Sequence, residues 1–242
     1  MVHSEPNTTE PKPLYGMFTD IPRRYDLVNR IITLGLDKRW REQAARECIA
    51  SQPQQILDLC CGTGDLAINI ARLAKFYVGI TGLDYSQPML DIAAKKAEQL
   101  AKVKITFTRS DAATLPFDDE YFDTVGISFA FRNLTYKNPL SQYHLAEIWR
   151  VLKPGGRCVI IETSQPEQKI VRMFLHLYLR SFVFWVGYWL SGNRAAFRYL
   201  SESAARFYTP GEVKELLLMA GFSEVVPHPL FLGAVSLYVA VK

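Results

Sequence analysis

Short apolar runs alternate with helical segments through the middle of the chain, and this alternation limits the fold more than any other feature of the sequence. Strands that alternate with helices in this rhythm favour a mostly parallel sheet with helices on both faces. The fold class is therefore predicted to be α/β. The predicted strands cover residues 56–60, 77–83, 105–108, 122–128 and 157–161, and the predicted helices between them cover residues 65–73, 86–100 and 138–152.

Local signals refine this outline. Residues 18–49 are predicted to be helical, with a break near Gly35. Ser86 stands where a serine caps the start of a helix. Residues 153–156, with sequence Lys-Pro-Gly-Gly, are predicted to form a tight turn.

The sheet is predicted to end in a hairpin. Residues 210–220 form one more predicted helix, with Gly221 as its C-cap. Residues 225–226 and 235–241 are strand-like and have no long helix between them. We therefore expect an antiparallel pair at one edge of the sheet.

Length and composition favour one domain. The 242 residues, 49% of them hydrophobic, can bury a full core, so residues 14–242 are predicted to form a single domain after a flexible tail at 1–13. Within it, residues 14–50 form N-terminal helices and residues 165–205 form an apolar substrate or lid insertion. A net charge of +4 makes no case for nucleic acid. The four cysteines and four histidines lack metal-ligand spacing, so we expect buried thiols, a cytoplasmic protein and no metal.

Residues 171–190 are strongly apolar and about as long as a membrane span. On a helix, however, Arg172, His176 and Arg180 form one polar stripe, which disfavours spanning a bilayer. We expect residues 170–190 to form a pocket lid or to contact the membrane surface as a peripheral segment. The alternatives are a core helix or a homodimer contact.

The first predicted strand ends in a loop that contains the chemistry-bearing residues Asp58, Gly62, Thr63, Gly64 and Asp65. In an open α/β sheet, ligands bind beyond the carboxyl ends of the strands. Glycines there let the backbone turn sharply and approach a ligand closely. With an alanine at position 67, the loop also matches the G-x-G-x-x-A pattern of dinucleotide sites, so the pattern alone leaves two cofactor classes open.

Acidic residues distinguish these classes. A pyrophosphate beside Asp58 and Asp65 would be repelled, since like charges about 4 Å apart cost roughly 4 kcal/mol at an effective dielectric constant of about 20. A cationic ligand without phosphate is favoured instead, which predicts S-adenosylmethionine. At the ends of the next strands, Asp84 can accept from both ribose hydroxyls and Asp111 from an adenine amino group. Ser128 closes the fourth strand, beside the loop that is expected to face the reacting methyl group.

Taken together, these residues resemble the ubiquinone/menaquinone biosynthesis C-methyltransferases, a family of class I S-adenosylmethionine-dependent enzymes. The resemblance extends from about residue 17 to residue 242. The departures from the common family pattern are Cys60-Cys61, Ala130-Phe131 and Glu162-Thr163-Ser164, and they leave open whether the acceptor is a benzoquinol or a naphthoquinol. The matching segments are 17–18, 24–29, 57–59 with 62–65, 115–117, 128–129 with 132–133, 150–156, and 199–200 with Ser203.

This resemblance implies a Rossmann-like, seven-stranded, mostly parallel sheet with an antiparallel C-terminal strand. It also implies methyl transfer from S-adenosylmethionine to a ring carbon of a polyprenylated hydroquinone. Arg132 is then expected to stabilise the developing phenolate, Asn133 to orient the ring, and Tyr25 to accept or relay the proton. The implied cofactor contacts are Thr63, Asp84, Asp111, Ala112 and Ser128, in addition to Asp58, Gly62 and Gly64 of the loop.

Three other functions stay open at this stage. A methyltransferase for another small hydrophobic acceptor would share the cofactor half of the chain. A nicotinamide-dependent oxidoreductase would have to tolerate Asp58 and Asp65 beside a pyrophosphate. A binding module without catalysis would keep the glycine loop but would not need Arg132.

Overall fold

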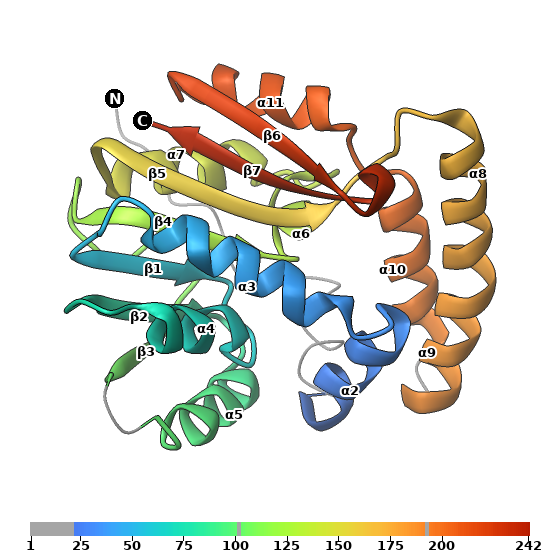
Figure 1. The fold of residues 1–242 in the computed structure, drawn as a ribbon, viewed down its shortest axis with the longest axis horizontal. Coiled ribbons are helices and arrows are strands. Elements are labelled where there is room, and N and C mark those ends of the chain that lie inside the picture. The colour runs from blue at the N-terminus through green and yellow to red at the C-terminus, as the bar shows by residue number, and fades with distance from the viewer. Residues whose placement is uncertain (1–21, 101–102, 192–193) are drawn as a thin grey trace.

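The computed structural model describes residues 22–100, 103–191 and 194–242, with the backbone alone at 22–25, 187, 190, 191, 194–197, 199 and 200. The strands are β1 (Gln55–Leu59), β2 (Gly79–Asp84), β3 (Ile105–Arg109), β4 (Phe122–Ser128), β5 (Leu152–Thr163), β6 (Glu224–Leu230) and β7 (Val235–Val241). They form one sheet in the order β3-β2-β1-β4-β5-β7-β6 (Figure 1). Because β1 pairs in parallel with β2 on one side and β4 on the other, the strand order reverses at β1. This is the switch point at which open α/β sheets bind ligands.

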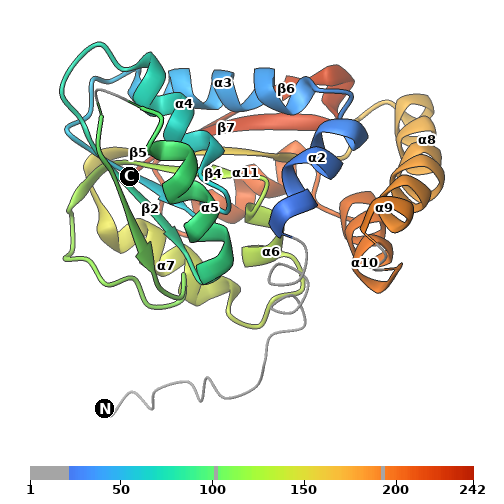
Figure 2. The ribbon, with the colours of Figure 1, turned by 90° about the horizontal axis from the view of Figure 1, so that it is seen from below.

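Helices cover both faces of this sheet, as predicted (Figures 1 and 2). One core lies between the strands and α3 and α4, and the other lies between the strands and α7 and α11. The helices are α2 (Pro22–Ile32), α3 (Leu36–Ile49), α4 (Asp65–Leu73), α5 (Gln87–Ala97), α6 (Phe131–Thr135), α7 (Ser141–Val151), α8 (Lys169–Tyr178), α9 (Phe184–Ser191), α10 (Arg194–Ala205) and α11 (Pro210–Met219).

The two cores follow from the alternation of side chains along the buried strands. In β1, Leu57 and Leu59 belong to the core under α7 and α11, while Ile56 belongs to the core under α3 and α4. Asp58 shares the face of Ile56, because its neighbours on the strand point the other way. A carboxylate is thereby placed inside an apolar layer, where it is 1% exposed.

The helix boundaries agree with the local sequence signals. The helix break predicted near Gly35 is confirmed, since Gly35 adopts φ 77° between α2 and α3. Ser86 occupies the N-cap position of α5, although its hydroxyl makes no capping bond. Gly221, with φ 102°, follows the end of α11. The predicted tail at 1–13 lies outside the described residues.

The tight turn predicted at residues 153–156 is wrong. These residues belong to β5, which pairs with β4 from Leu152 onward, and the register shifts where the extra residues bulge out of the ladder. Gly155 absorbs the distortion with φ 74°, and its N–H group donates to the carbonyl of Lys242 at 3.1 Å. A bulge replaces the turn because the strand needs no reversal at this point.

The predicted antiparallel hairpin is confirmed. β6 pairs with β7, and β7 also pairs antiparallel with β5, so β7 lies inside the sheet and β6 forms the edge. Every residue of β7 from Val235 to Ala240 is buried. This explains the continuous apolar pattern of that strand, since both of its faces are covered.

The apolar segment at 171–190 does not form one continuous α-helix. It contains α8, a π-helical turn at Leu179–Val183 and α9, and it packs with α10 and α2 beside one end of the sheet (Figures 1 and 2). A third, small core holds this group together through Leu179, Val183, Ala204 and Ala205. In the part of the chain that the structure covers, no helix is long and apolar enough to cross a bilayer.

Candidate functional site

A cavity of about 630 Å³ opens at the carboxyl ends of β1, β2 and β4. Its wall continues from the loop after β1 to α6 and α10. The volume is typical of a site for a cofactor or another small molecule. Among the predicted site residues, the cavity is lined by Gly62, Thr63, Asp84, Asp111, Ala112, Ser128 and Asn133. Asp58, Gly64 and Arg132 are not part of its lining, and the side chain of Tyr25 lies outside the described residues.

The two loop glycines have different roles. Gly62 adopts φ 53°, lines the cavity, and has nothing within 4 Å of the place where a Cβ would stand. Gly64 adopts φ 77° as the N-cap of α4, and a Cβ there would lie 2.9 Å from the Cβ of Ala93 on α5. Gly62 therefore leaves room for a ligand, whereas Gly64 allows α4 and α5 to pack closely.

Asp84 is the predicted acid that the cavity reaches most directly. Its Oδ2 accepts the N–H group of Gly62 at 2.9 Å, and its Oδ1 accepts the N–H group of Ser86 at 2.9 Å. Burial raises the pKa of Asp84 above 3.8, against the hydrogen bonds from Ser86 and Gly62. The backbone of Tyr85 donates a third hydrogen bond to this carboxylate. Because a carboxylate has about four acceptor positions, one remains for a hydroxyl group of a ligand.

Asp58 does not line the cavity, and its side chain instead contacts the helix that follows the glycine loop. Its Oδ2 accepts the N–H group of Ala67 in the first turn of α4 at 2.9 Å. Its Oδ1 is buried and has no hydrogen-bond partner among the described residues. Burial, as the largest cause, raises the pKa of Asp58 from 3.8 to about 7. The carboxyl group is therefore only partly ionised at neutral pH.

Replacing Asp58 with asparagine should change how stability depends on pH. Because the pKa in the folded protein is about 7 and the ordinary value is 3.8, the folded state keeps the proton between these values and loses stability as the pH rises through them. The ionised carboxylate costs on the order of 4 kcal/mol. The variant should thus gain stability relative to the unmodified protein between about pH 4 and pH 8. Denaturant unfolding across this range measures the difference. The same replacement at exposed Asp118 is the control, and a difference at position 58 that does not vary with pH would contradict the assignment.

The charge of Asp65 is largely compensated. Lys96 on α5 forms an ion pair with its Oδ1, and Arg41 on α3 lies 3.7 Å from its Oδ2. Asp58 is partly protonated and lies away from the cavity. The predicted repulsion of a pyrophosphate by Asp58 and Asp65 is therefore not the physical reason for the choice of cofactor.

Thr63 connects the glycine loop to α2. Its Oγ1 donates to Oδ1 of Asp26 at 2.7 Å, and Nζ of Lys96 donates to Thr63 at 3.2 Å and to Asp26 at 3.0 Å. We call Asp26, Thr63, Asp65 and Lys96 the Lys96 network. It ties the N-terminal helix to the loop that lines the cavity.

The other predicted cofactor contacts lie at the ends of β3 and β4. Asp111 accepts the N–H group of Ala113 at 3.0 Å and lines the cavity next to Ala112. Ser128 accepts a hydrogen bond from Nε of Arg41 at 3.2 Å. Its hydroxyl hydrogen can still be donated to a ligand or to a neighbouring acceptor.

Arg132 and Asn133 stand side by side on α6 but face different surroundings. The guanidinium of Arg132 is buried, donates to Oγ1 of Thr163 at 2.9 Å, and lies 3.6 Å from Oε1 of Glu162. Because both side chains are buried, the contact between Arg132 and Glu162 is not a surface salt bridge. Asn133 lines the cavity, and its buried Oδ1 has no hydrogen-bond partner among the described residues. That oxygen is therefore a buried hydrogen-bond acceptor without a partner on a residue that lines the cavity.

The structure adds site residues that the sequence reasoning missed. Arg41 lines the cavity, although its sequence context, Lys38-Arg39-Trp40-Arg41, is typical of a solvated helix face. Its position relative to buried Ala44 and Ala45, three and four residues later, could have placed it on the inner face of the helix. Two of the four cysteines, at positions 60 and 61, also line the cavity and are only partly buried.

No group of three His, Cys, Asp or Glu side chains in the described ranges is arranged to hold a metal ion. The polar lining instead offers carboxylate oxygens, backbone N–H groups, the buried guanidinium of Arg41 and the side-chain amides of Asn133 and Asn138. Such a set can bind hydroxyl groups, a carboxylate and an amine on one ligand.

Comparisons with known proteins agree with one another. The sequence model of the ubiE/COQ5 methyltransferase family matches residues 7–242. The chain is 40% identical to the demethylmenaquinone methyltransferase of Thermus thermophilus over 86% of this chain and 91% of that protein. It is 33% identical to a ubiquinone/menaquinone biosynthesis C-methyltransferase of Geobacter sulfurreducens over 97% and 90% of the two chains. Among solved structures, a SAM-dependent methyltransferase from Thermotoga maritima shares the fold, with a TM-score of 0.58 and 19% identity over 93% of this chain and 99% of that one.

Proposed function

Because the chain belongs to the ubiE/COQ5 methyltransferase family, we propose that it methylates a ring carbon of a polyprenylated quinol, such as a demethylmenaquinol. The protein is a methyltransferase, and S-adenosylmethionine is its cofactor. When bound, this cofactor supplies an electrophilic methyl group on a positively charged sulfur. One of the two relatives is named for methylation of demethylmenaquinone and the other for C-methylation in ubiquinone/menaquinone biosynthesis, and both match most of the chain.

The residues around the cavity fit this cofactor. Asp84 lines the cavity with an acceptor position left for a ribose hydroxyl, and Gly62 leaves the space that a Cβ would fill. Asp111 and Ala112 would hold the adenine, with Thr63 and Ser128 toward the amino-acid end. Asp58 and Gly64 would support these contacts from outside the cavity by fixing the loop and α4.

The proposed acceptor is supported by one observation, namely that a single cavity extends from the cofactor site to α10. The same cavity that contains Asp84 extends past Asn133 and Tyr136 to Ser203 on α10. Most of its lining is apolar, and α10 packs against the helices of the apolar segment. A ring can therefore lie near the cofactor site while an isoprenoid tail leaves toward α8–α10.

The reaction requires a nucleophilic ring carbon, so the acceptor must be the reduced hydroquinone. A phenol has a pKa near 10 in water, and sharing or losing its proton raises the electron density of the ring. We place the Oδ1 of Asn133 as the acceptor for the ring hydroxyl, because it is buried at the cavity without another partner in the described part of the chain. Tyr25 remains the proposed proton acceptor or relay.

Arg132 is proposed to act as a positioning residue. Its backbone N–H group donates to Oε2 of Glu162 at 3.1 Å while its side chain holds Thr163, so α6 is fastened to the end of β5. This attachment sets the position of Asn133 in the cavity. Holding reacting groups in line accounts for a large share of the rate in such transfers.

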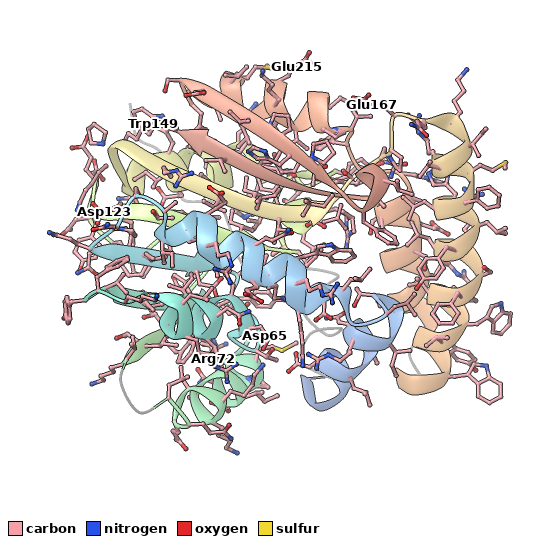
Figure 3. All side chains as sticks on the ribbon, in the orientation of Figure 1. Asp65, Arg72, Asp123, Trp149, Glu167 and Glu215 are labelled. Carbon is pink, nitrogen blue, oxygen red and sulfur yellow. The ribbon has the colours of Figure 1, made fainter. Side chains whose placement is uncertain are left out.

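Peripheral contact with a membrane is the second part of the proposal. The side chains of α8 and α9 project from the outer side of the molecule (Figure 3), and we call the exposed apolar residues among them the α8–α9 apolar face. Lys169 and Arg180, which are also exposed, can interact with anionic headgroups at its border. The core-helix alternative is wrong, because this face is exposed. The α8–α9 apolar face consists of Ile170, Met173, Phe174, Leu177, Phe182, Trp185, Tyr188 and Trp189.

A transfer assay tests the proposed acceptor. The purified protein, with S-adenosylmethionine carrying a labelled methyl group, is expected to label a short-chain demethylmenaquinol kept reduced by dithionite. The oxidised quinone should not be labelled, because its ring is electron-poor. Mass spectrometry locates the methyl group on a ring carbon. Transfer only to a non-quinol acceptor, or binding of NADH without binding of S-adenosylmethionine, would contradict the proposal.

A further inference from the structure

Arg41 is a positively charged residue in the wall of the cavity. The roles assigned above to the glycine loop and the acidic residues do not explain why a cation lies there. Its side chain is 10% exposed, comes from α3 and lines the cavity. Burying a guanidinium is costly unless it is paired with an anion, so a buried guanidinium at a ligand site indicates that anionic groups bind it.

The hydrogen bonds of Arg41 leave part of its guanidinium unused. Nη1 lies 2.6 Å from Oδ2 of Asp37, and Nε donates to Oγ of Ser128 at 3.2 Å. Within the described residues, these two hydrogen bonds use two of its five N–H groups. The third anion nearby, Asp65, is 3.7 Å away and is already paired with Lys96. Several N–H groups thus remain for a further acceptor.

The orientation of Arg41 is fixed before any ligand arrives. Asp37 is 2% exposed and holds one end of the guanidinium, while the ring of Phe129 lies under it with 5.3 Å from Cζ to the ring centroid. Ser128 fixes the Nε side. A planar guanidinium held in this way offers parallel N–H groups, which suit a carboxylate.

We propose that Arg41 binds the α-carboxylate of the cofactor's amino-acid group. This assignment depends on the proposed function, because it takes S-adenosylmethionine as the ligand. The cofactor ends in a carboxylate, and the charged side chain that follows Thr63 in the cavity lining is the acid Asp65, which would repel it. Arg41 is the buried cation at that end, whereas Lys137 and Arg206, which also line the cavity, are exposed. Arg41 therefore distinguishes the intact cofactor from fragments and analogues that lack the carboxylate.

Binding of two product analogues tests this without any turnover. S-Adenosylhomocysteine carries the carboxylate, and S-adenosyl-3-thiopropylamine is the same molecule without it. The variant is Asp37→Asn/Arg41→Gln, which removes both charges of the buried pair, and the matched control is Asp37→Asn alone. Calorimetry should show that the double variant binds S-adenosylhomocysteine at least about tenfold more weakly than the control, as expected for loss of a charge-assisted pair. The decarboxylated analogue should bind both variants equally.

Each other result has a distinct meaning. Equal losses for both analogues, or no loss for either, would overturn the role of Arg41 while leaving the cofactor assignment intact. Failure of both analogues to bind the unmodified protein would overturn the proposed function and the Arg41 assignment with it. If the double variant does not unfold cooperatively, Arg41→Lys provides the same comparison, because it keeps the charge and loses the paired N–H groups. A selective loss for S-adenosylhomocysteine is again the expected result.

Discussion

Replacing Arg132 with methionine is expected to lower the free energy of unfolding by about 3–5 kcal/mol, because the change leaves the carboxylate of Glu162 buried without its cation. Glu162 is fully buried, and Arg132 is 4% exposed. The remaining hydrogen bonds to Glu162 come from the backbone N–H groups of Arg132 and Thr163 and from the Thr163 hydroxyl, and none of them carries a charge. Guanidinium denaturation at pH 7 measures the loss.

The matched control is the double variant Arg132→Met/Glu162→Gln. With both charges removed, most of the lost stability should return, and the coupling between the two sites should appear in the double-mutant cycle. The refolded double variant then allows the positioning role to be measured. We expect its cofactor affinity to match the unmodified protein and its kcat to fall by about 10–100-fold, because Asn133 is no longer held in place. A single variant as stable as the double variant would show that the buried pair does not contribute.

Replacing Phe174, Trp185 and Trp189 with serine is expected to reduce binding to anionic vesicles at least about a hundredfold. These side chains are 60%, 54% and 81% exposed, so the folded structure loses little when they change. Burying a large apolar side chain in lipid contributes about 1.5–3 kcal/mol, and three of them lie on the α8–α9 apolar face. Co-sedimentation with vesicles of phosphatidylglycerol and phosphatidylcholine measures the effect.

The control variant carries the same number of serines at exposed apolar positions elsewhere, namely Tyr77, Met219 and Leu232. It should bind vesicles like the unmodified protein. If the α8–α9 apolar face instead joins two copies of the chain, the triple variant will change the mass measured by light scattering and leave vesicle binding unchanged. That result would contradict the membrane contact.

The strands and the mostly parallel character of the sheet were predictable because buried strands leave a direct trace in the sequence. Asp84 and Ser128 stand at strand ends, so the topology alone brings them to one edge of the sheet. The direction in which Arg132 points could not be predicted, for the opposite reason. Neighbouring residues on a helix point in different directions, and nothing in the sequence states that Arg132 turns toward Glu162 while Asn133 turns toward the cavity.

The ionisation of the site residues is equally difficult to predict from the sequence. Asp58 and Asp65 look alike in sequence, as acids on either side of the glycine loop. In the fold, one is buried with a pKa of about 7 and the other pairs with Lys96, which is 31 residues further along the chain. Such partners depend on how helices meet, so the ionisation and net charge of a site are set by packing that the local sequence does not contain.

The small core that joins the π-helical turn after α8 to α10 has a further consequence. It rests on four buried side chains, two of them alanines, whereas β1 and β4 lie between two large cores. Regions with few buried contacts open at a lower free-energy cost than the rest of a protein. Amide hydrogens in these helices should therefore exchange with deuterium well before those of the central strands. Brief separation of the helices would give a long isoprenoid chain a way in and out while the sheet stays folded.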